Sequence, residues 1–124
     1  MKTTLIVLAT ATLLVGAVAQ SGRAEFLANM SGQGKGKSTW KIRDNGTQFQ
    51  AELQAEGENL ARNTVYRLRI LTNTWNVTTD GFGKYAFARL YTTANRPNIV
   101  AGTTVRLYRT NGTLAQTGTY VRTR

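Results

Sequence analysis

Short runs of alternating apolar and polar residues fill most of the chain after residue 37, with turn-forming residues between them. Trp40 and Ile42 alternate with Lys41 and Arg43, and the same alternation runs through residues 49–54. Successive side chains of a strand point to opposite faces of a sheet. The two-residue period therefore predicts β-strands that bury one face.

Asx-Gly pairs join neighbouring runs of this kind. They are Asn45-Gly46 between 40–43 and 49–54, Asp80-Gly81 between 74–79 and 83–91, and Asn111-Gly112 between 105–109 and 114–121. Such pairs favour the two-residue type I′ turn, in which both central residues need a positive φ. They predict β-hairpins at all of these places, and hence an antiparallel all-β domain.

Two further segments need a decision between strand and connection. Residues 52–63 are rich in helix-favouring types, but Gly57 interrupts them and the alternation of the preceding run continues into them. We expect a strand to about Ala55, followed by a connection. The Gly-rich segment 31–36 is expected to be a flexible connection.

The segment 60–70 combines an alternating strand with a spaced Leu and Tyr. Tyr66 opens the strand, Leu60 precedes it by six residues, and Arg67 and Arg69 fall on the opposite face. This spacing resembles the tyrosine corner of fibronectin type III domains and other Greek-key sandwiches. There the Tyr hydroxyl forms a hydrogen bond to the backbone a few residues upstream. Arg62 departs from the Pro usual in those families.

A second segment carries a looser resemblance. Pro97 precedes the stretch Ala101-Gly102-Thr103, and Val105 then opens the run that ends at Asn111-Gly112. This arrangement is similar to that of small exported bacterial sandwich proteins. The resemblance implies a fold but does not indicate an activity. We therefore expect a Greek-key antiparallel β-sandwich of about seven or eight strands, Ig-like in style. A small closed barrel is the alternative.

The N-terminus reads as an export signal. Lys2 precedes an uncharged apolar run, 5–18, and Ala17-Val18-Ala19 is a small-x-small cleavage pattern. An uncleaved membrane anchor is the alternative, but the run is shorter than the roughly 20 residues that span a bilayer. We expect residues 1–19 to be removed and the domain to be secreted, periplasmic or at the cell surface. Within it, 20–37 would hold an arm, the first strand and the Gly-rich connection, and 38–124 the remainder.

Composition limits the chemistry. The chain has 16 Lys and Arg against 6 Asp and Glu, a formal charge of +10, and no His or Cys. The usual general base, thiol nucleophile and soft metal ligands are thus missing, so we expect no enzyme activity, cofactor or metal. Glu56 and Glu58, with Asn59, would be the candidates for a carboxylate pair or a calcium site. A solvated acidic loop is the favoured interpretation.

The excess of positive charge points to anionic partners, namely acidic glycans, nucleic acid or an anionic cell-surface component. If the apolar residues of the alternating strands face inward, then a set of basic residues faces outward: Lys41, Arg43, Arg67, Arg69 and Arg106. Strands that are neighbours in one sheet would combine them into a polyanion-binding face. The alternative is that these cations only solvate the outer surface.

Two other functions remain open. Trp75, Phe82 and Tyr85 are candidates for exposed aromatic rings, which would stack on sugars in a carbohydrate-binding module. The Thr- and Gly-rich composition also fits a structural subunit that self-associates at a cell surface or in a matrix. Mature residues 20–124 contain no second apolar run, so no membrane span is expected there.

Overall fold

The computed structural model describes residues 22–92 and 95–124, and these residues form nine β-strands and no helix. The strands are β1 (Gly22–Gly32), β2 (Gly34–Asp44), β3 (Phe49–Glu58), β4 (Val65–Ile70), β5 (Asn73–Thr78), β6 (Tyr85–Tyr91), β7 (Thr104–Arg109), β8 (Leu114–Thr119) and β9 (Val121–Arg122). The all-β expectation is confirmed. The expected signal segment, 1–19, lies outside the described residues.

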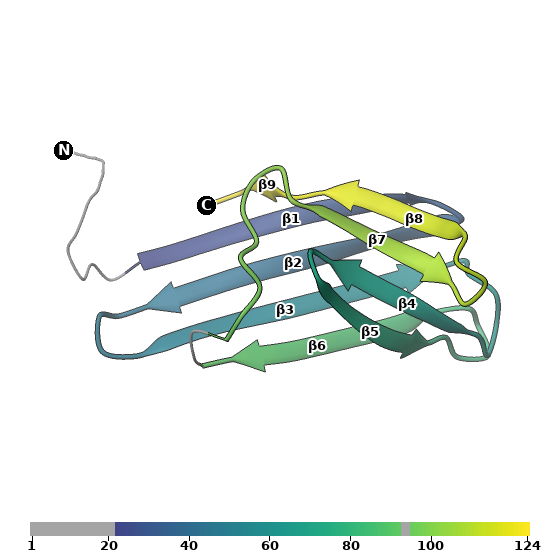
Figure 1. Cartoon of the computed structure of the whole chain (residues 1–124), viewed down its shortest axis with the longest axis horizontal. Helices are drawn as coiled ribbons and strands as arrows, with labels where there is room; N and C mark the ends of the chain where they lie inside the picture. The colour runs from purple at the N-terminus through teal and green to yellow at the C-terminus, as the bar shows by residue number, and fades with distance from the viewer. Residues whose placement is uncertain (1–21, 93–94) are drawn as a thin grey trace.

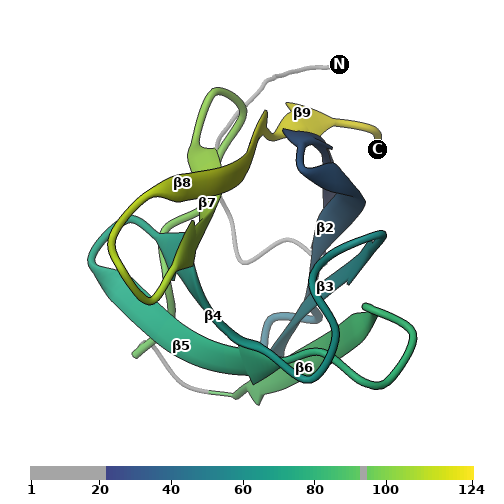
Figure 2. The ribbon, with the colours of Figure 1, turned by 90° about the vertical axis from the view of Figure 1, so that its right-hand side faces the viewer.

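All strand pairs are antiparallel and belong to a single sheet with the order β5-β4-β7-β8-β1-β2-β3-β6, while β9 pairs with β1. The sheet curls until it is nearly closed into a barrel, as the end-on view in Figure 2 shows. The Greek-key sandwich is not confirmed, because hydrogen bonds link every strand into this one sheet. The small barrel named as the alternative is closer to the observed architecture.

The barrel has a seam where β5 and β6 meet. Both strands lie along the lower side of Figure 1, but no backbone ladder joins them. The Trp75 ring on β5 instead packs against the Phe87 ring on β6, with ring centroids 5.3 Å apart. Side-chain packing thus bridges part of the seam, which no backbone ladder crosses.

The alternation in the sequence correctly separates the two faces of most strands. Tyr66, Leu68 and Ile70 are buried along β4, and Arg67 and Arg69 between them are exposed. Trp40 on β2 is 1% exposed and forms an edge-to-face contact with Tyr91, with centroids 5.7 Å apart. These side chains form the core inside the curled sheet.

The Asn45-Gly46 pair joins β2 to β3 as expected, but the turn is not type I′. The loop spans 45–48, and of its residues only Gly46 has a positive φ, at 88°. Asn45 Oδ1 instead accepts hydrogen bonds from the backbone N–H groups of Thr47 and Gln48. A side-chain cap therefore shapes this turn.

The other two Asx-Gly pairs have different outcomes. Asn111-Gly112 lies in the β7–β8 hairpin, with Gly112 at a φ of 90°. The hairpin expected at Asp80-Gly81 is wrong, because β5 pairs with β4 and β6 pairs with β3. Two hairpins were not predicted: β1–β2, and β4–β5, whose turn contains Leu71 at a φ of 56°. A non-glycine residue at positive φ gives little turn signal in a sequence.

Two expected connections are strands. The Gly-rich segment 31–36 contains the end of β1, a tight turn at Gln33 and the start of β2. Gly34 has a φ of 65°, and a Cβ there would collide with the Glu58 carbonyl oxygen. The expectation that the third strand ends near Ala55 is also wrong, because β3 continues to Glu58. Gly34 permits close approach of the β3 backbone, whereas Gly57 leaves room for the Tyr85 ring.

The expected hydrogen bond of Tyr66 is present. Its hydroxyl accepts a hydrogen bond from the backbone N–H of Ala61 at 3.1 Å, five residues upstream. Leu60 is buried, and Asn63 has a φ of 50°. The contact fixes the long connection from β3 to β4, and it does so inside a single curled sheet.

Candidate anion-binding face

Three of the predicted cations come together on the outer surface of β4 and β7. Arg69 on β4 lies directly opposite Arg106 on β7, and Arg67 is two residues from Arg69 on the same face. All three side chains are exposed. We call this set, Arg67, Arg69 and Arg106, the arginine face.

No carboxylate balances the arginine face among the described residues. The four neighbouring strands β5, β4, β7 and β8 contain no Asp or Glu. The Arg69 side chain donates a hydrogen bond from Nε to the Leu71 carbonyl oxygen at 3.3 Å. Like charges directly opposite in a sheet destabilise it, so the Arg69–Arg106 pair costs folding free energy.

The other two predicted cations lie elsewhere. Lys41 and Arg43 are on β2, which is separated from β7 by β8 and β1 in the sheet order. Adjacent strands, the condition for one shared face, therefore bring together Arg67, Arg69 and Arg106 but not Lys41 and Arg43. Lys41 stands opposite Glu25 on one side and Glu52 on the other, so its charge is balanced. The alternation predicted which face of the sheet each residue occupies, but it could not predict which strands are neighbours.

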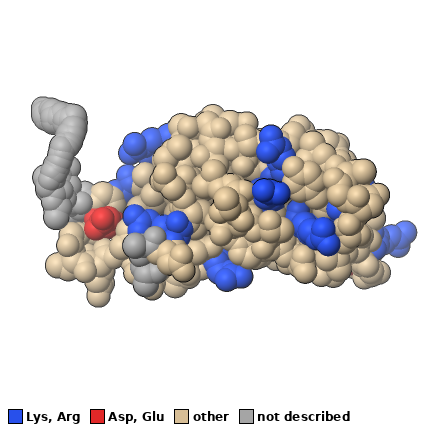
Figure 3. All heavy atoms as spheres, viewed as in Figure 1, with Lys and Arg blue, Asp and Glu red and all other residues tan. Residues whose placement is uncertain are grey.

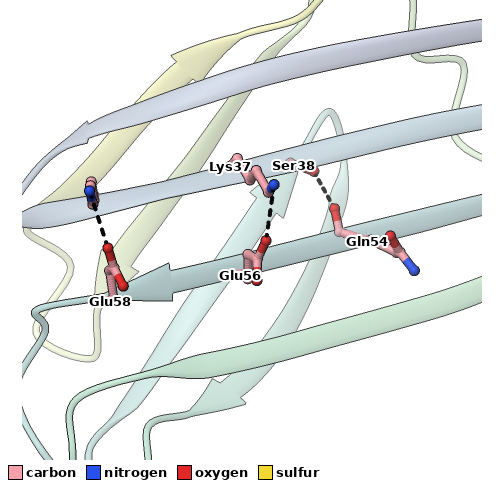
Figure 4. Close-up of polar contacts among 6 residues, drawn as sticks. Lys37, Ser38, Gln54, Glu56 and Glu58 are labelled. Atoms are coloured by element: carbon pink, nitrogen blue, oxygen red, sulfur yellow. Dashed lines mark hydrogen bonds and ion pairs between the residues drawn. The ribbon is translucent and has the colours of Figure 1, made fainter.

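Two Lys–Glu ion pairs lie on the outer surface of β2 and β3. Lys35 Nζ lies 3.3 Å from Glu58 Oε2, and Lys37 Nζ lies 3.4 Å from Glu56 Oε2 (Figure 4). Glu56 and Glu58 thus belong to a strand, not to the loop expected for a calcium or carboxylate-pair site. Each carboxylate has a Lys partner, and no group of three acidic side chains within the described ranges is placed to hold a metal ion.

The contrast between these surfaces is visible on the whole molecule. Figure 3 shows Lys and Arg at several places on the face that carries β4, β5 and β7, while acidic side chains show only near one end. Strands β1, β2 and β3 lie behind this face in Figure 1. They carry Glu25, Asp44, Glu52, Glu56 and Glu58. Charge is therefore divided between the walls of the barrel.

The three predicted aromatic residues do not form one platform. Phe82 is 83% exposed at a loop tip, but Tyr85 is only 4% exposed, so its proposed role as a surface ring is wrong. Trp75 is half-buried at the seam against Phe87. Tyr85 faces inward because it stands opposite Gly57 of β3, where the missing side chain leaves room for the ring.

The pKa values of Asp80, Tyr85 and Tyr120 are shifted by their surroundings. Backbone N–H groups of Lys84 and Phe82 donate hydrogen bonds to the Asp80 carboxylate and lower its pKa, which stabilises the loop before β6. Burial raises the pKa of Tyr85, and burial raises that of Tyr120 to about 12.

Sequence reasoning missed one basic residue with an unusual position. Arg89 occupies an alternate position of β6 that it shares with Tyr85, Phe87 and Tyr91, and these positions face the barrel interior. We call them the inward positions of β6. It is nevertheless exposed, because β6 borders the open seam. A charged residue interrupting an aromatic alternation was the available signal.

Comparison with known proteins adds no assignment. No protein-family model matches the chain, and no curated protein resembles it closely enough to count as a relative. The described residues include no helix long and apolar enough to cross a membrane.

Proposed function

We propose that this protein is an exported, non-catalytic binding domain that holds a polyanion on the arginine face. The supporting observation is the division of charge between the walls of the barrel. On β2 and β3, Lys35 and Lys37 form ion pairs with Glu58 and Glu56. On β4 and β7, Arg69 and Arg106 oppose each other with no carboxylate on the neighbouring strands.

Solubility alone does not account for this arrangement. A soluble surface is served by interspersed charges of both signs, which is the pattern on β2 and β3. The Arg69–Arg106 pair costs folding free energy, as does the Arg23–Arg43 pair on β1 and β2, but only Arg69–Arg106 lies within a group of four strands that carry no carboxylate. The cost is offset when an anion occupies the face, because the planar guanidinium forms bidentate contacts with phosphate, sulfate or carboxylate groups.

The test is a salt-titrated binding measurement with a size-defined heparin oligosaccharide and a single-stranded DNA oligonucleotide. Three arginine contacts predict a slope of about −2 to −3 in a plot of log affinity against log salt concentration. Reversing two charges, in Arg69→Glu/Arg106→Glu, is expected to abolish most of the binding and reduce the slope by about 2.

A matched control uses Arg23 and Arg43, which oppose each other on β1 and β2. The variant Arg23→Glu/Arg43→Glu changes the net charge by the same amount as Arg69→Glu/Arg106→Glu. Like that variant, it replaces an opposed Arg–Arg pair with a Glu–Glu pair. It is expected to retain most of the affinity. Equal losses in the two variants would show that net charge alone attracts the polyanion, and the proposed face would be wrong.

Self-assembly is a second candidate, favoured by the seam. Strands β5 and β6 each have a hydrogen-bonded neighbour on one side only, so each leaves an edge that another strand could extend. Light scattering over a range of protein concentrations tests this function. A concentration-independent monomer mass would exclude it.

A further inference from the structure

A groove of about 390 Å³ lies at the seam. The β4–β5 turn forms one side of it, β5 and β6 contribute Asn73, Trp75, Arg89 and Tyr91, and residues 95–98 form the other side. Trp75 and Tyr91 are only half-buried there. The groove exists because no backbone ladder joins β5 to β6. The gap leaves inward-facing side chains of these strands accessible to solvent.

The lining of the groove combines polar side chains with two aromatic rings. Two partly exposed aromatic rings, Trp75 and Tyr91, lie beside the amide groups of Asn73 and Asn98. An amide both donates and accepts hydrogen bonds, which suits neighbouring hydroxyl groups. Arg89 adds a cation, and its guanidinium lies 5.9 Å from the centroid of the Phe87 ring.

Solvation of the outer surface does not explain why an Arg occupies inward position 89. The neighbouring inward positions of β6, Phe87 and Tyr91, are aromatic, and an apolar residue at position 89 would extend the packing across the seam. Departures from a local pattern concentrate at functional sites. The groove contains no Asp or Glu among its lining residues, so Arg89 is available to an anionic group.

The groove and the arginine face approach each other at the β4–β5 turn. Arg69 donates its Nε hydrogen bond to the carbonyl of Leu71, and Leu71 lines the groove. Arg106 lies directly opposite Arg69 on the next strand. A chain-like ligand lying across the arginine face can therefore reach the seam at the β4–β5 turn.

We infer that the polyanion is an acidic polysaccharide, and that the seam groove binds one of its sugar rings. The inference rests on the proposed function and adds the class of ligand. Trp75 and Tyr91 contact the ring, Asn73 and Asn98 bind its hydroxyl groups, and Arg89 binds its carboxylate or sulfate. The mainly polar lining favours a hydroxyl-rich ring over a nucleic-acid base, which stacks on an open aromatic face.

Tryptophan fluorescence can report occupancy of the groove. The chain has two Trp residues, of which Trp40 is 1% exposed inside the barrel and Trp75 lines the groove. A heparin oligosaccharide or an oligogalacturonate is expected to shift the emission at saturating concentration. The shift should disappear in Trp75→Phe, which keeps an aromatic ring against Phe87.

A second variant leaves both charge and aromatic packing intact. Asn73→Ala removes a hydrogen-bonding amide and is expected to weaken acidic oligosaccharide binding by about fivefold to tenfold. Binding of a single-stranded DNA oligonucleotide, which would use only the arginine face, should not change. Circular dichroism checks that each variant is folded.

The outcomes separate the two proposals. If acidic oligosaccharides bind with sensitivity to Arg69→Glu/Arg106→Glu but leave Trp75 emission unchanged, the groove inference is wrong and the arginine face stands. If the DNA oligonucleotide shifts Trp75 emission equally and loses equal affinity in Asn73→Ala, the groove binds nucleic acid and the glycan inference is wrong. If neither polyanion binds, the proposed function itself is wrong.

Discussion

Tyr120 places a hydroxyl inside the barrel, where it forms a hydrogen bond with Ser38. The two oxygens are 2.6 Å apart, and both residues are fully buried. Ser38 also donates to the Gln54 carbonyl oxygen, so the network links β2, β3 and the residue after β8. Burial raises the Tyr120 pKa to about 12, although the hydrogen bond with Ser38 opposes the rise.

This environment predicts a loss of stability at alkaline pH. The unfolded chain releases the Tyr proton near pH 10, whereas folded Tyr120 retains it until about pH 12. Stability contributed by the neutral hydroxyl is complete below pH 10 and is lost between these values. The free energy of unfolding should fall there by about 1.4 kcal/mol per pH unit for each such tyrosine, and Tyr85, whose pKa is also raised, adds to the slope.

The variant Tyr120→Phe tests both effects. At neutral pH it is expected to lower the free energy of unfolding by about 1 kcal/mol, because Ser38 loses a buried partner. Between pH 10 and 12 its slope should be shallower than that of the wild-type protein. Urea denaturation measures both, with Tyr108→Phe at a half-buried position as the control for loss of a hydroxyl. Equal slopes for wild type and Tyr120→Phe would contradict the assignment.

At the scale of the element, similar dipeptides serve different turns. Gly112 has a φ of 90°, whereas Gly81 has no positive φ, and a Cβ at either position would meet nothing within 4 Å. Space is thus equal at the two sites and only backbone conformation differs. The conformations differ because Asn111-Gly112 lies in the β7–β8 hairpin, whereas no hairpin forms at Asp80-Gly81.

Opposite effects are therefore expected from the same substitution. Gly112→Ala should destabilise the protein by about 1–2 kcal/mol, because an L-residue is strained at that φ. Gly81→Ala should stabilise it by about 0.4–1 kcal/mol by restricting the unfolded chain. Thermal and urea denaturation of both variants provide the measurement. A similar loss of stability in both would indicate that Gly81 also needs a glycine conformation.

The ladder between β4 and β7 gives a second prediction at this scale. Arg106→Glu would place a carboxylate opposite Arg69 and replace a like-charged pair with an opposite one. We expect the free energy of unfolding to rise by about 0.5–1 kcal/mol at low salt, while polyanion affinity falls.

The matched change Arg43→Glu, opposite Arg23, should also raise stability but leave affinity largely unchanged. Chemical denaturation and the binding titration of the same samples check both effects. Loss of stability together with affinity in Arg106→Glu would indicate a folding defect and would contradict the prediction.

At the scale of the whole molecule, the strands that border the seam differ from the others in having a hydrogen-bonded neighbour on one side only. Strand β2 is paired on both sides, whereas β5 and β6 are each paired on one side. Amides that point into the seam have no ladder partner. Hydrogen exchange is expected to be faster at alternate amides of β5 and β6 than anywhere in β2. Uniform protection along β5 would instead indicate that the seam is paired in solution, within the monomer or between copies.

Part of this organisation could be predicted from the sequence. The alternation along β4 correctly placed Tyr66 and Leu68 inside and Arg67 and Arg69 outside. The spacing of Leu60 and Tyr66 anticipated the hydroxyl bond to the backbone. These features depend on neighbours in the chain, so local geometry is sufficient to predict them.

The candidate site was predicted only in part, since it depends on which strands are adjacent. Arg69 and Arg106 meet because β7 pairs with β4, and Lys41 lies elsewhere because β2 pairs with β1 and β3. No local pattern distinguishes these pairings. Arg89 was missed for the same reason, since its exposure follows from the seam and not from its own strand.

The sequence by itself determined an all-β chain, the inward and outward faces of its strands, two of its hairpins and its excess of positive charge. The tertiary structure alone decided that the strands form one curled sheet, that charge is balanced on one wall and unbalanced on another, and that the barrel stays open between β5 and β6. The physical reason is that side-chain direction has a period of two residues, whereas sheet order and closure depend on contacts between distant segments.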